Sequence, residues 1–139
     1  MGLYNEDVHL YDTFHIGVSV GIPPKTAYAI AAYNNLIDER YLVRYYDDRA
    51  NWHFVTHERV AALLSNALST CDIETLGSAL HLLQDYYSHT LQGYKPRWGH
   101  ISTGGKPDVP ANNLNLYHQM LGATKGAMRQ FKDRCFCTK

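Results

Sequence analysis

Three residues in one stretch of the chain have the types and spacing of metal ligands: His81, Asp85 and His89. Successive members are four positions apart, so on a helix they share one face, within roughly 80° of arc. Imidazole and carboxylate ligands suit zinc, and iron and manganese also accept this ligand type. The pattern predicts a metal site. The alternative is a polar, solvated helix face that happens to carry these residues.

The spacing of the two histidines bears on the number of ions. His81 and His89 would lie about 12 Å apart along a helix axis, whereas a metal–nitrogen bond is only about 2 Å long. One ion cannot easily reach both nitrogens. Asp85 lies between them, and a carboxylate can bridge two ions. The spacing therefore favours a cluster of metals along the helix over a single site.

Further residues of the same ligand types are spread along the chain: His9, Asp38, His53, His100 and Asp108. Helical bundles build metal sites from ligands on several helix faces and adjoining loops. These residues are therefore candidate partners of the first three. Of the eight histidines in the chain, we expect the remaining three, His15, His57 and His118, to be ordinary packed or surface residues.

The elements that must position these side chains are predicted to be helices, about five in number. The first runs from about residue 5 to 20, with Gly21 as its stop, and the second from Pro24 to about Leu36, ending near Asp38. Thr56 and Asp72 are plausible N-caps of the third and fourth helices, and the fourth runs from Ile73 to about Leu91. Asn112 or Asn113 caps the last helix, which carries an apolar stripe. The members of that stripe are Leu114, Tyr117, Leu121, Met128 and Phe131.

Two long loops, at about residues 40–54 and 94–110, separate these helices, and loops of this length are often functional. No segment alternates as a convincing strand would. The predicted fold is therefore an all-α, compact bundle of about five helices around a multinuclear metal site, formed by one domain over residues 1–139.

Composition agrees with a single folded domain. The chain has 139 residues, of which 45% are hydrophobic and 19% charged, so disorder is not expected. Its 13 basic and 13 acidic residues give a formal net charge of zero, which disfavours a broad basic face for nucleic acid. Two or three divalent ions would change that balance, however, so the neutral sum describes only the metal-free chain.

Cysteines and targeting signals give less information. Cys71, Cys135 and Cys137 are odd in number and irregularly spaced, so we expect no disulfide framework and free thiols in the tail. No apolar run is long enough to span a bilayer, and the N-terminus lacks the features of a signal peptide. Both observations fit an intracellular protein or a domain of a larger secreted one.

Residues 76–90, LGSALHLLQDYYSHT, resemble the zinc-dependent phospholipase C superfamily, which includes the single-strand-specific zinc nucleases. The likeness is closest to the fungal heterokaryon-incompatibility C family and to bacterial toxin-tip domains of Rhs-type and type VI effectors. Flanking pieces follow in the family's order: DVHLY at 7–11, NNLIDE at 34–39, NWHF at 51–54 and GHISTGGKPD at 99–108. The resemblance covers about residues 5–110 and implies an all-α fold.

The resemblance also implies roles for the candidate ligands. His9 would bind one ion of a close pair, and the other ion would be bound by Asp38, His53 and His81. Asp85 would bridge the pair, while His89, with His100 and Asp108, would bind a third ion. The N-terminal Trp that the phospholipases use as a ligand is missing, and Asp7 or Asp12 could replace it. The His-x3-Glu pair that serves the third ion in those enzymes is missing too.

The function that the resemblance implies is a zinc-dependent phosphodiester hydrolase with two or three zinc ions, most similar to phospholipase C. Metal-activated water would attack phosphorus, and Asp38 would orient that water or accept its proton. A phospholipid is the favoured substrate. If the chain is the toxin domain of a secreted effector, a cognate immunity protein is its expected partner. The alternatives are a single-strand nuclease of the same superfamily and a metal-stabilised helical binding module without catalysis.

Overall fold

The computed structural model describes residues 7–40, 56–87 and 114–136, without the side chains of Asp7 and residues 38–40. The described elements are η1 (Asp7–Asp12), α1 (Thr13–Ser19), α2 (Pro24–Arg40), α4 (His57–Thr70), α5 (Ile73–Asp85) and α7 (Leu114–Cys135). Element η1 is a short π-helix and the others are α-helices. No strand occurs in the described residues. The prediction of an all-α bundle is confirmed.

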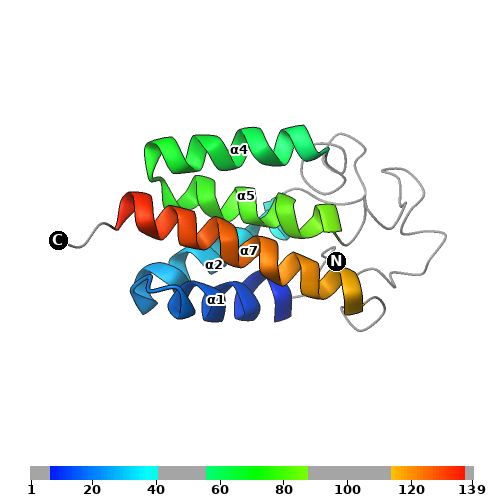
Figure 1. Cartoon of the computed structure of the whole chain (residues 1–139), viewed down its shortest axis with the longest axis horizontal. Coiled ribbons are helices and arrows are strands. Elements are labelled where there is room, and N and C mark those ends of the chain that lie inside the picture. Colours follow the sequence, from blue (N-terminus) through cyan, green and yellow to red (C-terminus); the bar gives the residue numbers. More distant parts are fainter. Residues whose placement is uncertain (1–6, 41–55, 88–113, 137–139) are drawn as a thin grey trace.

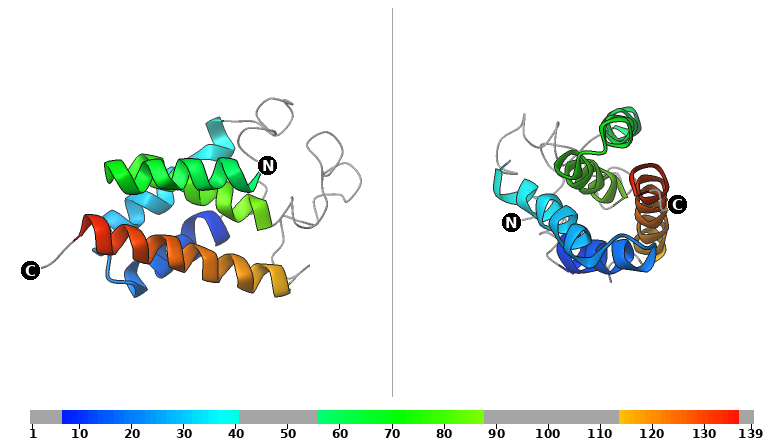
Figure 2. Two further views of the ribbon diagram at one scale, coloured as in Figure 1. Left: turned by 45° about the horizontal axis from the view of Figure 1, so that its top comes forward. Right: turned by 90° about the vertical axis from the view of Figure 1, so that its left-hand side faces the viewer.

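Helix α5 lies in the middle of the bundle (Figures 1 and 2). Viewed down the bundle, α4 lies above it, while α2, α1 and α7 surround it from the other sides. Leu76 and Leu80 of α5 are fully buried in the hydrophobic core, and His81 and Asp85 are fully buried as well. Both faces of the helix are therefore covered. The alternative that His81 and Asp85 belong to a solvated face is wrong.

The two predicted helix caps are confirmed. The hydroxyl of Thr56 accepts a hydrogen bond from the backbone N–H of Arg59 at the start of α4. The carboxylate of Asp72 accepts from the backbone N–H groups of Glu74 and Thr75 at the start of α5. Each cap pairs amides that have no acceptor inside their own helix. These helix starts are thus specified locally.

The first two helices differ from prediction at their ends. The first helical segment is not one regular helix, because residues 7–12 form the wider π-turns of η1 before α1 begins. Gly21 follows α1 with φ 101°, a left-handed conformation that glycine adopts readily, so the predicted stop is confirmed. Helix α2 continues to Arg40, beyond the end expected near Asp38. The predicted long loops and the cap at Asn112 or Asn113 lie outside the described residues.

The predicted apolar stripe of α7 is confirmed except at its first residue. Met128 and Phe131 are fully buried, and Tyr117 and Leu121 are partly buried against the cluster of Val8 and Met120, but Leu114 is 56% exposed. Met120 and Thr124, which the sequence pattern does not place in the core, are fully buried instead. The start of α7 thus lies beyond the core, and contact with the core begins at Tyr117.

The expectation of free tail thiols is wrong for Cys135, which forms a disulfide with Cys71. Cys71 is the C-cap of α4 and Cys135 is the last residue of α7, and their Cα atoms lie 5.6 Å apart. The two cysteines are 64 positions apart in the sequence, so only the packing of the two helix ends brings them within the range that a disulfide can span.

Among the described helices, none combines the length and the apolar character that crossing a membrane requires.

Candidate metal centre

A buried cluster of two imidazoles and one carboxylate lies between η1 and the C-terminal half of α5. Nε2 of His81 lies 2.9 Å from Oδ2 of Asp85, and Nε2 of His9 lies 3.5 Å from Oδ1 of the same carboxylate. The imidazole rings are stacked, with centroids 4.0 Å apart and an interplanar angle of 22°. All three side chains are 0% exposed. Each oxygen of Asp85 therefore faces a different histidine.

The local sequence explains how these groups meet. His81 and Asp85 are four residues apart on α5, so one turn of the helix places one above the other. His9 comes from η1, which packs against both α2 and α5. Val8, beside His9, is fully buried in a small cluster with Met120 of α7. This contact fixes η1 against the bundle while His9 points inward.

Polar side chains hold the far side of each ring. Nδ1 of His81 lies 2.9 Å from the backbone carbonyl oxygen of Asn34 and 3.1 Å from its side-chain oxygen. Nδ1 of His9 lies 2.9 Å from Oε1 of Gln84. Both rings thus use Nδ1 to contact an oxygen and present Nε2 to Asp85. Metal-binding histidines typically make this kind of supporting hydrogen bond through the nitrogen that is not a ligand.

The donor set fits a metal ion. One ligand atom from each of His9, His81 and Asp85 can be chosen so that all three lie within 4.8 Å of one another. Two ligand atoms bound tetrahedrally at about 2.1 Å would be roughly 3.4 Å apart, close to the distances observed here. Two nitrogens and a carboxylate oxygen are typical zinc ligands. The residues therefore fit zinc without a large rearrangement.

Of the eight predicted ligands, the structure brings together His9, His81 and Asp85. Asp38 lies on α2, but its side chain is outside the described part. Four others lie in segments outside the described residues: His53, His89, His100 and Asp108. Those four roles and the role of Asp38 stay predictions. Asp12, suggested as a replacement ligand, accepts a 2.5 Å hydrogen bond from the hydroxyl of Tyr117.

Sequence reasoning missed the polar residues that support the cluster. Thr13, Asn34, Gln84 and Thr124 are all buried and joined by side-chain hydrogen bonds. Gln84 directly precedes the candidate ligand Asp85, which is a signal that the sequence contains. A signal was present at Asn34, which lies one helical turn before the candidate ligand Asp38 on α2.

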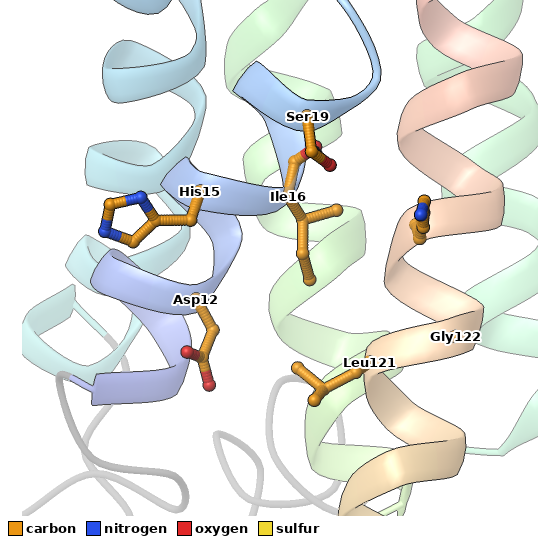
Figure 3. A pocket seen from close by; sticks show the side chains of 7 residues that line it. Asp12, His15, Ile16, Ser19, Leu121 and Gly122 are labelled. Carbon is orange, nitrogen blue, oxygen red and sulfur yellow. Dashed lines mark hydrogen bonds between the residues drawn. The ribbon is translucent and has the colours of Figure 1, made fainter.

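The three histidines expected to be ordinary, His15, His57 and His118, are exposed. His15 lines an open hollow of about 350 Å³ between α1 and α7 (Figure 3), together with Asp12, Leu121 and Lys125. None of the three cluster residues lines this hollow. The hollow is therefore separate from the candidate metal centre.

Comparisons of the chain with models of protein families, with curated proteins and with solved structures each found no match. The likeness to the zinc-dependent phospholipase C superfamily thus depends on the sequence motifs alone. The case for the metal centre depends on its geometry.

Proposed function

We propose that this protein is a zinc-dependent phosphodiester hydrolase whose metal centre is built on His9, His81 and Asp85. The observation that carries the proposal is the convergence of two Nε2 atoms on the two oxygens of one fully buried carboxylate. A carboxylate with a different histidine at each oxygen is arranged as a bridging ligand needs to be. This arrangement supports a site for a close pair of ions, in which Asp85 would be the shared ligand.

The chain's own residues bind and orient in this proposal. His81 and Asp85 hold their relative position through one turn of α5, while η1 adds His9 from a separate element. Zinc, when bound, supplies Lewis acidity, which polarises a phosphoryl oxygen and lowers the pKa of a water molecule. Asp38 remains the residue we propose to orient that water or accept its proton.

The positions of the third ion and of the substrate are proposed from the layout of the bundle. One end of the bundle, where η1 starts, carries the C-termini of α2 and α5 and the N-termini of α4 and α7 (Figure 1). The segments that carry His53, His89, His100 and Asp108 connect to these helix ends. We therefore place the third zinc ion and the phosphodiester substrate, with phospholipid as first choice, at this end.

The disulfide supports a role outside the reducing cytosol. Disulfides persist mainly in oxidising compartments, and Cys71–Cys135 joins two helices of this bundle. This agrees with the proposal that the chain is the toxin domain of a secreted effector, for which an immunity protein would be the partner.

A second candidate function is a metal-stabilised binding module without catalysis. The complete burial of His9, His81 and Asp85 favours it, because structural zinc sites have closed coordination while catalytic sites keep an open position. The single-strand nuclease alternative predicts the same centre and differs only in its substrate.

The test is elemental analysis of the purified protein, combined with turnover of a chromogenic phosphodiester with and without a chelator. Two or three zinc ions per chain and chelator-sensitive turnover are expected. Metal without turnover on a panel of phospholipids and single-stranded nucleic acids would favour the binding module. A protein without bound metal would rule out both candidate functions.

The variant that tests the bridging role is Asp85→Asn. We expect it to lower metal affinity by about 100-fold or more, since loss of a supporting residue alone typically costs 10–100-fold, and to abolish turnover. His118→Asn is the control, because His118 is an exposed histidine on α7. Full metal content and activity in Asp85→Asn would exclude the bridging role.

A further inference from the structure

We infer that Asn34 and Gln84 form a positioning relay, which fixes both histidines of the centre as Nδ1–H tautomers and aims both Nε2 lone pairs at Asp85. The inference rests on the proposed metal centre, because a metal ion is the group that such an arrangement serves. It assigns roles to two residues that are not themselves ligands.

The relay begins at a backbone atom. The carbonyl oxygen of Asn34 can only accept a hydrogen bond, so Nδ1 of His81, 2.9 Å away, must carry the proton. The same N–H also faces the side-chain oxygen of Asn34 at 3.1 Å. The amide of Asn34 is thereby oriented with its oxygen toward His81, since its NH2 group would place two donors in contact.

The orientation of the Asn34 amide fixes the orientation of the Gln84 amide. The NH2 group of Asn34 donates to Oε1 of Gln84 at 2.9 Å and to the hydroxyl oxygen of Thr13 at 3.2 Å. The NH2 group of Gln84 then donates to Thr13 at 2.9 Å and to Thr124 at 3.3 Å. Thr13 donates its own proton to the carbonyl oxygen of Val8. The hydroxyl of Thr13 therefore donates one hydrogen bond and accepts two, which is the most that a hydroxyl can make.

The relay ends at the other histidine. Because Oε1 of Gln84 is an acceptor, Nδ1 of His9, 2.9 Å away, must be the donor. A neutral His9 and a neutral His81 then both carry their lone pair on Nε2. Those nitrogens lie 3.5 Å and 2.9 Å from the oxygens of Asp85. Two imidazole lone pairs and a carboxylate, all buried, form a set that attracts a cation.

The two histidines differ in the kind of oxygen that Nδ1 contacts. Nδ1 of His81 lies against a backbone carbonyl, whereas Nδ1 of His9 lies against the side-chain oxygen of Gln84. Replacing Gln84 should therefore release the tautomer of His9 and leave that of His81 unchanged. Replacement of a residue with a purely structural role would not change the tautomer of one histidine and leave that of the other unchanged.

The experiment measures ring 15N chemical shifts of His9 and His81 in metal-free protein at alkaline pH, because these shifts distinguish the two neutral tautomers from the imidazolium. In the wild-type chain we expect Nδ1–H tautomers at both. In Gln84→Met we expect His9 to lose this preference and His81 to keep it. Affinity for Co2+, followed by its visible absorption, should fall about 10–100-fold in that variant.

Two control variants sharpen the test. Gln84→Glu keeps an acceptor oxygen toward His9, so we expect it to retain the Nδ1–H tautomer of His9. Thr124→Val removes the 3.3 Å contact with the NH2 group of Gln84 and the 3.5 Å hydrogen bond from Thr124 to Sδ of Met120. Neither involves the oxygen of Gln84 that faces His9, so the Co2+ affinity of this variant should stay close to that of the wild type.

The relay is overturned if His9 carries its proton on Nε2 in the wild-type chain. It is also overturned if a folded Gln84→Met variant keeps both the tautomer of His9 and wild-type Co2+ affinity. Absence of metal binding in the wild-type chain would instead refute the proposed function, and the tautomers of the metal-free protein would still decide on the relay.

Discussion

Gly77 is the position at which the packing of the bundle and the geometry of the metal centre can be tested together. It lies on α5, one helical turn before His81, where α5 crosses α2. A Cβ atom at Gly77 would lie 2.6 Å from Cβ of Tyr33, 2.8 Å from the carbonyl oxygen of Ile30 and 2.9 Å from the backbone nitrogen of Asn34. Backbone atoms of a helix cannot rotate away. The substitution Gly77→Ala must therefore push α5 and α2 apart.

The expected loss of stability follows from two opposing contributions. Overpacking a tight core costs about 1–3 kcal/mol, and the upper end applies here because the nearest atoms belong to the neighbouring helix backbone or to a Cβ. Replacing glycine by alanine inside a helix gains about 1 kcal/mol of helix propensity. We expect a net loss of about 2 kcal/mol in the free energy of unfolding, measured by urea denaturation followed by circular dichroism.

Two other glycines provide matched controls. Gly122 and Gly126 lie in α7 and are exposed, and a Cβ atom added at either would have no atom within 4 Å beyond its own helix backbone and chain neighbours. Alanine at either position should gain up to about 1 kcal/mol of stability. The difference between Gly77→Ala and Gly122→Ala should thus be about 3 kcal/mol. Equal stability of these two variants would refute the close approach of α5 and α2.

The same substitution should weaken the metal centre. Asn34, whose backbone nitrogen is one of the atoms displaced, accepts the hydrogen bond from Nδ1 of His81. A shift of α2 relative to α5 lengthens this bond, so zinc affinity should fall in Gly77→Ala and not in Gly122→Ala. Isothermal titration with zinc measures both.

Two further predictions concern the ends of the helices. Replacing both Cys71 and Cys135 by serine should cost up to about 4 kcal/mol, the chain-entropy value for a closed loop spanning 64 positions; identical denaturation curves with and without reductant would contradict this. Replacing Asp72 by alanine should cost about 1 kcal/mol. The hydrogen bond from the hydroxyl of Thr75 holds the pKa of Asp72 below its ordinary value of 3.8, so the cap stabilises the fold above that pH and loses this contribution as the pH falls through the folded-state pKa. An Asp72→Asn variant compared by denaturation at pH 7 and pH 3 checks the sign.

Local features of the fold could be predicted from the sequence because their causes are local. Thr56 and Asp72 cap helices through bonds to amides two or three residues away, so the sequence pattern contains the whole interaction. The pairing of His81 with Asp85 is similar, because one turn of helix determines it. The shared face of His81 and Asp85 on α5 is confirmed for the same reason.

Features that need a second element could not be predicted in this way. Nothing near Cys71 in the sequence indicates that the end of α7 will lie beside it. Thr13 and Thr124 are ordinary polar residues of amphipathic helices until the packing places their hydroxyls on Gln84. The exposure of Leu114 has the same origin, because α7 extends beyond the core that covers its later turns. The packing of helices, and not their periodicity, decides these cases.

The two histidines of the centre differ in the number of elements on which each depends. His81 shares α5 with Asp85, and its other nitrogen is held by a backbone oxygen of α2. His9 lies on the short η1 element, and its Nδ1 contacts the side-chain oxygen of Gln84 on α5. The pair His81 and Asp85 is therefore the part of the centre that folding of α2 against α5 already assembles. His9 completes the donor set only when η1 packs against both helices, which makes it the ligand most sensitive to substitutions outside the centre.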